Sequence, residues 1–462
     1  MVVETTTAAA RRAVLVAATV AAFLTPFMGS TINVALPTIG RELQMDAVLL
    51  GWVNTAYLIA AAMSLVPFGR IADIYGRKKV FAWGTLLFTV SSLLAGFANS
   101  AAMLIALRVL QGISGGMIFG TSVAILTSVF PPGDRGRVLG INVAAVYVGL
   151  SVGPFVGGLL TEHFGWRSIF YTNVPLGLIV LALILWKLKG DWAMARGEKF
   201  DLTGSVIYGI TLLGITYGLS TLPELLGVWL ILVGVVALVA FVWWEMRAKS
   251  PVLDVRLFRN NAVFAFSNVA ALINYGATFA VSFLLSFYLQ YIKGFTPETA
   301  GLILISAPVV QAVVSPAAGR LSDRVQPRIL ASVGMALCIV PLGVFALLGY
   351  DSSLGLIVGS LVLLGFGFAL FSSPNTNAVM SSVENRSYGV AAATLATMRQ
   401  VGMTLSMGIA MMLFAVYIGR VEITPEYYDA FLRSERTAFI VFACLCFAGV
   451  FASLARGRVA GK

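Results

Sequence analysis

Two arginines lie within long apolar segments of this chain, and they are the residues best placed to do chemistry. Arg108 is followed one helical turn later by Gln111, and Arg399 falls near the middle of its segment. A guanidinium stays charged and donates several hydrogen bonds, so it can hold an anion or a carbonyl group. Inside a membrane such a charge is costly unless it faces protein or water. We therefore expect both side chains to line a solute-binding cavity; for Arg108, a structural role bound to backbone carbonyls is the alternative.

Aromatic and amide side chains could complete the lining of that cavity. Tyr275, Phe279 and Phe283 recur every four residues, as expected for one apolar wall of a ligand site. Packing or lipid contact is the alternative for these rings. The predicted cavity residues are Arg108, Gln111, Arg399, Asn33, Tyr275, Phe279 and Phe283.

A short charged turn, Gly69–Lys79, separates two apolar segments, and a degraded copy, Gly319–Arg328, occupies the same context later in the chain. Asp73 and Arg77 are four residues apart, so they can form an ion pair across the turn or reach a neighbouring helix end. A generic basic loop of the cytoplasmic side is the alternative for this segment. Gly76 lets the backbone bend tightly there. A turn of this kind used twice indicates two duplicated halves that can move against each other.

A glycine- and proline-rich segment, Gly149–Gly158, predicts a helix that can kink and be approached closely by its neighbours. Such a helix suits a hinge or a tight seal between halves, and plain close packing is the alternative. The predicted conformational residues are Gly69, Asp73, Gly76, Arg77, Gly149, Gly153, Pro154, Gly157, Gly319, Asp323 and Arg324.

The composition excludes a soluble protein. The chain has 462 residues, of which 59% are hydrophobic and 11% charged, and its mean hydropathy is +0.92. So few charges cannot cover a soluble surface, and the apolar runs are continuous rather than alternating, which excludes a β-barrel. The net charge of +11 comes without the interleaved aromatic residues of a nucleic-acid groove, so no nucleic-acid partner is expected. The three cysteines all lie in apolar segments, so we expect neither a metal site, nor a cofactor, nor a disulfide framework.

Fourteen segments are long and apolar enough to cross a bilayer as helices. We place them at 13–36, 48–69, 79–98, 102–129, 138–160, 167–187, 202–221, 226–246, 260–291, 297–318, 329–349, 354–380, 388–417 and 437–456. Most of the 31 Lys and Arg residues then fall in loops on the side that holds both termini. Because basic residues collect on the cytoplasmic side, we predict cytoplasmic termini.

The connections near 188–201 and 247–259 are the longest on the inner side, and they bracket one pair of helices. This spacing predicts a 6 + 2 + 6 arrangement in an all-α polytopic membrane protein. Residues 1–190 would form an N-terminal six-helix bundle, 191–255 an inserted pair, and 256–462 a C-terminal six-helix bundle.

Several segments resemble those of the major facilitator superfamily. The turn Gly69–Lys79 is similar to its signature loop, Arg108–Gly116 to its fourth-helix arginine motif, and Gly149–Gly158 to its antiporter motif. Trp166–Gly177 and the pair Arg399-Gln400 resemble the fourteen-helix drug:proton antiporter family within it. The resemblance covers nearly the whole chain. It implies a major facilitator fold, alternating access around a cavity between two halves, and proton-driven export of amphipathic compounds.

The chain departs from that family at one position. The family usually has an aspartate shortly before the segment Asn33–Pro37, where this chain has Met28. By the predicted topology none of the 20 carboxylates lies deep in a helix, so the buried charges should all be arginines. Such a cavity favours anionic or neutral solutes over cations. Proton coupling would then depend on Asp73, on a peripheral carboxylate or on the solute's own proton. The remaining alternative is transport that is not coupled to protons.

The sequence as a whole favours a secondary transporter of the plasma membrane that works as a monomer and exports amphipathic neutral or anionic small molecules. The alternative is a uniporter or uptake carrier for a small metabolite, without proton antiport. An enzyme or receptor is disfavoured, because we find no nucleophile with a base, phosphate loop or metal-ligand cluster. The absence of a nucleotide-binding domain excludes a primary pump.

Overall fold

The computed structural model describes residues 8–188, 192–193, 195–248, 250–253, 255–322, 324–384 and 388–457. In these ranges the chain is helical, with short connections and no strand. The first six helices are α1 (Ala8–Leu43), α2 (Ala47–Tyr75), α3 (Arg77–Ala95), α4 (Ala101–Val129), α5 (Pro132–Phe164) and α6 (Arg167–Lys187). They pack mainly on one another, and we call them the N-terminal group.

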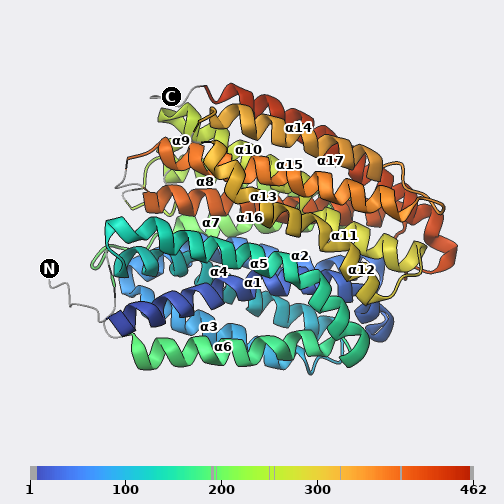
Figure 1. Cartoon of the computed structure of the whole chain (residues 1–462), viewed down its shortest axis with the longest axis horizontal. Helices are drawn as coiled ribbons and strands as arrows, with labels where there is room; N and C mark the ends of the chain where they lie inside the picture. Colours follow the sequence, from blue (N-terminus) through green and yellow to red (C-terminus); the bar gives the residue numbers. More distant parts are fainter. Residues whose placement is uncertain are drawn as a thin grey trace.

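The second set begins after a pair of helices, α7 (Leu202–Thr221) and α8 (Leu225–Glu245). It consists of α9 (Arg256–Asn260), α10 (Ala262–Thr278), α11 (Ala280–Phe287), the π-turn η1 (Tyr288–Ile292), α12 (Pro297–Leu304), α13 (Ser306–Leu321), α14 (Pro327–Phe345), α15 (Leu354–Ser381), α16 (Tyr388–Tyr417), the 3-10 turn η3 (Pro425–Tyr427) and α17 (Tyr428–Ala455). We call α10–α17 the C-terminal group. Figure 1 shows α1–α6 as one layer of helices and α10–α17 as the other.

Thirteen segments of the described chain are long and apolar enough to span a membrane. Several of them join two or three elements; for example, α10, α11 and η1 together make the span Ala262–Ile292. Helix α3 is not among the thirteen, since it starts with three basic residues, Arg77, Lys78 and Lys79. The protein is therefore a polytopic helical membrane protein, as predicted, while the count of fourteen spans stays a prediction.

Glycines allow the helices inside each group to approach closely. A Cβ atom on Gly112 of α4 would lie 2.3 Å from the carbonyl oxygen of Tyr57 in α2, and one on Gly116 would lie 2.9 Å from that of Ala61. In the C-terminal group, a Cβ on Gly334 would lie 2.6 Å from the carbonyl oxygen of Gly367. With no large apolar driving force between helices in lipid, such backbone contact is a main source of their association.

The inserted pair α7 and α8 contacts both groups. The hydroxyl of Tyr208 in α7 donates to the carbonyl oxygen of Ala62 in α2 at 3.2 Å. A Cβ on Gly408 of α16 would lie 3.2 Å from Leu219 of α7. The division into 1–190, 191–255 and 256–462 nevertheless stays a prediction.

The two groups meet at the end of the molecule away from the start of α1 and the end of α17, where Figure 1 shows α11 and α12 lying close to the N-terminal group. Ser286 donates to the carbonyl oxygen of Asn33 at 2.9 Å, and Gln290 donates to that of Val34 at 2.9 Å. A Cβ on Gly301 of α12 would lie only 2.2 Å from the carbonyl oxygen of Pro154 in α5. Backbone contact as close as this closes the interior at this end, which we call the sealed end.

Candidate functional site

A cavity of about 1880 Å³ lies between the two groups. It extends from Asn33 and Pro154, near the sealed end, to Asp73 and Glu198 at the opposite end, which we call the mouth. Its wall is amphipathic, with aromatic rings next to amides, hydroxyls and arginines. A space of this size and lining can hold a small organic molecule.

Arg399 lies in this wall. Its Nη2 donates to Thr376 Oγ1 at 2.6 Å, and its guanidinium carbon lies 5.5 Å from the centre of the Tyr275 ring. The Nε atom has no hydrogen-bond partner among the described residues. Next to it, the Gln400 side chain donates to the carbonyl oxygen of Leu58 at 3.2 Å, which connects α16 to α2 of the N-terminal group.

Two of the three rings of the predicted aromatic wall lie in the cavity wall. Tyr275 and Phe279 line the cavity, and Phe368 packs edge-on against Tyr275 at 5.1 Å between centres. The prediction for Phe283 is wrong, because this ring is fully buried against Phe287 and Phe414 outside the cavity. A helix has 3.6 residues per turn, so each step of four residues rotates the side chain by roughly 40°. Over two such steps the third ring leaves the face of the first.

Arg108 and Gln111 lie behind the cavity wall, which contradicts the prediction that they line it. Arg108 is fully buried; its Nε donates to the carbonyl oxygen of Val53 at 2.9 Å and its Nη1 to Gln111 Oε1 at 2.9 Å. Gln111 in turn donates to Ser92 Oγ at 2.8 Å. The Tyr57 ring lies 4.4 Å from the guanidinium and itself lines the cavity. Arg108 thus joins α2, α3 and α4 in the way the structural alternative describes.

Asn33 lies at the inner end of the cavity. Asn54 donates to its side-chain oxygen, so α1 and α2 present a pair of hydrogen-bonded amides to the interior. Such a pair offers polar contacts to a solute without adding charge.

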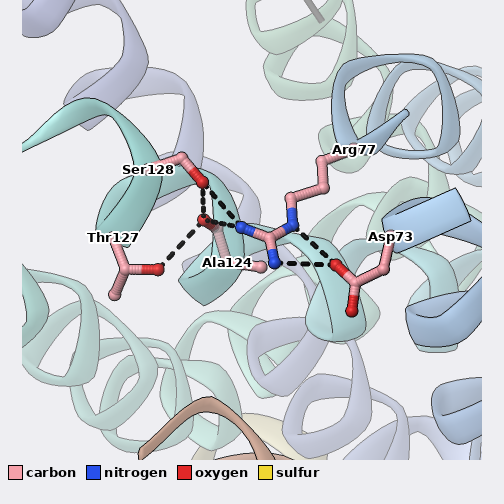
Figure 2. A network of polar contacts seen from close by, with 5 residues as sticks. All are labelled: Asp73, Arg77, Ala124, Thr127 and Ser128. Atoms are coloured by element: carbon pink, nitrogen blue, oxygen red, sulfur yellow. Dashed lines mark hydrogen bonds and ion pairs between the residues drawn. The ribbon is translucent and has the colours of Figure 1, made fainter. Parts of the chain in front are cut away.

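The charged turn forms a network at the mouth, which Figure 2 shows. Two nitrogens of Arg77 contact Asp73 Oδ1, at 2.8 and 2.7 Å. Its Nη1 also donates to the carbonyl oxygen of Ala124 at 3.0 Å and to Ser128 Oγ at 2.6 Å. Gly76 has a φ of 120°, a conformation that other residues rarely adopt. Arg77 therefore links the α2–α3 turn to the end of α4.

The segment after α6 docks on this turn. The backbone N–H of Ala195 donates to the carbonyl oxygen of Asp73 at 2.9 Å. The backbone N–H of Arg77 donates to the carbonyl oxygen of Trp192 at 3.0 Å. Glu198 forms an ion pair with Arg70. Asp73 and Glu198, the two carboxylates among the described residues of the cavity wall, are thus both paired with arginines at the mouth.

The degraded copy of the turn is only partly described. A Cβ on Gly319 would lie 2.9 Å from Ser373 Oγ. Arg324 is exposed, and its backbone N–H donates to the carbonyl oxygen of Leu321 at 3.0 Å. Asp323 lies outside the described residues.

The glycine–proline helix α5 packs against both groups. A Cβ on Gly149 would lie 2.7 Å from the carbonyl oxygen of Phe23 in α1. A Cβ on Gly153 would contact Ser30, and one on Gly157 would contact Thr31 of the same helix. On another face, Pro154 contacts Gly301 of α12, as described above. This helix is therefore part of the closed contact at the sealed end.

Sequence reasoning missed three buried charged residues. Glu245 and Glu435 are 1% and 2% exposed, so the prediction that the buried charges are arginines alone is wrong. Neither carboxylate oxygen of Glu435 has a hydrogen-bond partner among the described residues. Helix α17 starts at Tyr428, well before the predicted 437, and this error in the boundary placed Glu435 in a loop.

The third missed residue is Arg456, at the end of α17. It is 1% exposed and donates to Asn375 Oδ1 at 2.9 Å, to Ser267 Oγ at 3.3 Å and to the carbonyl oxygen of Ser453 at 2.8 Å. Burial lowers the pKa of Arg456 to about 10, so it stays charged at neutral pH. It holds the ends of α10, α15 and α17 together.

Comparison with known proteins identifies the family. The model of the Major Facilitator Superfamily matches residues 18–407. The chain belongs to the Major Facilitator Superfamily. It is therefore a multi-pass membrane transporter of small molecules and not an enzyme.

Three curated relatives cover most of the chain. The riboflavin transporter RibZ of Clostridioides difficile (strain 630) is 29% identical over 95% of this chain and 95% of its own. The cephamycin export protein CmcT of Amycolatopsis lactamdurans is 34% identical over 97% and 94%. The multidrug resistance protein Stp of Mycobacterium tuberculosis (strain CDC 1551 / Oshkosh) is 31% identical over 84% and 73%.

Solved structures agree on the fold. A bacterial homolog of the human lysosomal transporter Spinster, in an inward-facing and unoccupied conformation, superposes with a TM-score of 0.68 at 18% identity, covering 97% of this chain and 98% of that one. The D-xylose-proton symporter superposes with a TM-score of 0.70 at 15% identity, covering 98% and 99%. At these identities the likeness concerns the fold alone.

Proposed function

We propose that this transporter is a secondary active exporter of amphipathic small molecules, neutral or anionic, and that it works by alternating access. The observation that supports this most is the amphipathic cavity, which is sealed at one end and reaches the mouth at the other. In an alternating-access cycle, the two halves rock against each other, so that a central cavity opens to one side of the membrane at a time. A cavity that is sealed at one end corresponds to one of these two states. Relatives named as a multidrug resistance protein and a cephamycin export protein support the export direction.

The membrane arrangement belongs to the same proposal. The chain would cross the plasma membrane fourteen times as a monomer, in a 6 + 2 + 6 order, with both termini and the mouth in the cytoplasm. The concentration of basic residues at this end supports that orientation, since Arg70, Arg77 and Lys78 all belong to the turn at the mouth.

Coupling differs from the usual antiporter in this proposal. Met28 stands where the drug:proton antiporter family usually has an aspartate. It is fully buried, and its sulfur accepts a hydrogen bond from the side-chain amide of Asn173 at 3.2 Å. The carboxylates in the described wall of the cavity, Asp73 and Glu198, are paired at the mouth. A proton therefore has few places to bind next to the solute, and this favours the second candidate, a uniporter or uptake carrier without proton antiport.

Transport in sealed vesicles separates these functions. The purified protein is reconstituted with an imposed pH gradient, and the movement of a neutral fluorescent dye, N-phenyl-1-naphthylamine, is followed. Accumulation that needs the protein and the gradient supports proton-coupled export. Equilibration that needs the protein but not the gradient supports the uniporter. Vesicles without protein, and vesicles treated with a protonophore, are the controls; dye movement identical to that of empty vesicles would refute transport of this class of solute.

A further inference from the structure

Arg399 is a cationic group in the cavity wall, and no carboxylate of the described residues pairs with it. Of the arginines in the described wall, Arg70 and Arg77 are paired with acidic residues at the mouth, and Arg11 lies in the first turns of α1. Among the described residues, Arg399 makes a single hydrogen bond, to Thr376 Oγ1, and its buried Nε has no partner. A guanidinium has five N–H donors, so Arg399 keeps donors that can bind a ligand.

Flat apolar surface adjoins this charge. The Tyr275 ring lies below the guanidinium, Phe368 packs edge-on against Tyr275, and Phe279 follows one turn later on the cavity face. A solute held by Arg399 would therefore lay its body along aromatic rings. Stacked and edge-on aromatic contacts favour a planar, conjugated body.

The N-terminal group reaches the same place through Tyr147 of α5. The Tyr147 hydroxyl lies 3.2 Å from Ser372 Oγ in α15. Ser372 is one turn before Thr376, whose hydroxyl donates to the Ser372 carbonyl oxygen at 2.8 Å. A ligand bound to Arg399 thus lies beside a phenol of the opposite group, which can donate to one of its oxygens.

We propose that Arg399 is the binding site for the carboxylate of an aromatic acid, with the planar body on Tyr275, Phe279 and Phe368. This inference rests on the proposed transport function and names its substrate class. The planar fork of a guanidinium matches the two oxygens of a carboxylate and binds them in parallel. Tyr147 adds a hydrogen bond from the other group, so the bound acid contacts both sides of the cavity.

Two probes that differ only in charge test the site. 2-Naphthoate and 2-naphthamide share one ring system, and their binding to the purified full-length protein is measured by isothermal titration calorimetry. We expect the wild type to prefer the carboxylate by about 10-fold or more, the size of a charge-assisted hydrogen-bonded pair. Arg399→Gln should remove that preference while changing 2-naphthamide binding by less than about twofold.

Further variants separate charge from geometry. Arg399→Lys keeps the charge but loses the fork, so it should keep only part of the preference. Tyr147→Phe keeps the ring and should weaken 2-naphthoate binding by about 3- to 10-fold. Arg259→Gln is the matched control, because Arg259 is exposed and outside the cavity wall; it should bind both probes as the wild type does.

The outcomes are decisive in either direction. No 2-naphthoate binding to the wild type, equal binding of the two probes, or a preference retained in Arg399→Gln would each overturn the inference. If Arg399→Gln does not fold, the wild-type comparison and Arg399→Lys still decide it. If the protein transports the dye but does not prefer 2-naphthoate, the proposed export function is supported and the carboxylate site at Arg399 is rejected. If it prefers 2-naphthoate but does not transport the dye, the carboxylate site is supported and the proposed transport function is rejected.

Discussion

The close contact between Gly301 and Pro154 yields a quantitative prediction for the variant Gly301→Ala. The added Cβ would lie 2.2 Å from the Pro154 carbonyl oxygen, whereas ordinary contact begins at 3.4 Å, so α12 and α5 must separate by about 1.2 Å. Overpacking of this kind costs about 1–3 kcal/mol. Residue 301 lies inside α12, which we expect to stay helical when the halves rock as rigid bodies, so the helix propensity gained by alanine should affect both states equally. The population ratio of open to sealed should therefore rise by about 5- to 150-fold.

Pulsed electron spin resonance measures this shift directly. Spin labels are attached to cysteines at Phe164 and Asp351, two exposed positions near the sealed end on opposite groups, after the exposed Cys444 is changed to Ser. Gly301→Ala should add or enlarge a population with a longer distance. Gly359→Ala is the matched control, since its Cβ would meet nothing within 4 Å. If Gly301→Ala and Gly359→Ala give the same distances as the parent protein, the glycine contact does not determine closure.

Three more variants test separate parts of the structure. Arg108→Gln removes buried hydrogen bonds from the guanidinium and should lower stability by about 2–3 kcal/mol, read as a lower melting temperature in detergent; an unchanged melting temperature contradicts the structural role of Arg108. Arg77→Gln frees the turn at the mouth from α4 and should slow dye transport several-fold, about 1–2 kcal/mol, without changing 2-naphthamide affinity in calorimetry; normal turnover would remove this network from the conformational cycle. Glu298→Gln breaks the half-exposed pair with His163, 3.1 Å apart across the sealed end, and should shift the spin-label populations by less than about 1 kcal/mol; a shift as large as that of Gly301→Ala would contradict this ranking.

The architecture was predictable because a membrane imposes strong rules on sequence. A spanning helix needs a long apolar run, and every such run between 13 and 456 corresponds to a helix in the structure. The boundaries were less predictable. Helices α1 and α17 extend well past their apolar parts, because polar residues beyond the hydrocarbon core continue the same hydrogen-bonding pattern.

The site was predictable only in part, because residue type does not determine which face of a helix meets the cavity. Arg108 and Arg399 look alike in sequence, as lone charges in apolar helices. Arg108 has Gln111, the Tyr57 ring and a backbone carbonyl within reach, so it is held inside one group, although its Nη2 has no hydrogen-bond partner among the described residues. Arg399 lies in the cavity wall, and the one hydrogen bond recorded for it among the described residues is to a hydroxyl. That difference arises from neighbours on other helices, which one sequence does not reveal.

Different kinds of contact occur at the two ends of the cavity, and this difference should shape the transport cycle. The sealed end depends on backbone surfaces that touch at Gly158, Gly301 and Pro154, a fit that is lost after a movement of about 1 Å. At the mouth, arginine–carboxylate pairs at Asp73 and Glu198 hold the turn and the segment after α6 together, and their attraction falls off more slowly with distance. Closure at the sealed end should therefore be abrupt and insensitive to salt, whereas docking of that segment at the mouth should weaken as ionic strength rises. A solute that bridges Arg399 and Tyr147 acts between the two ends, where a small rotation of one group changes both.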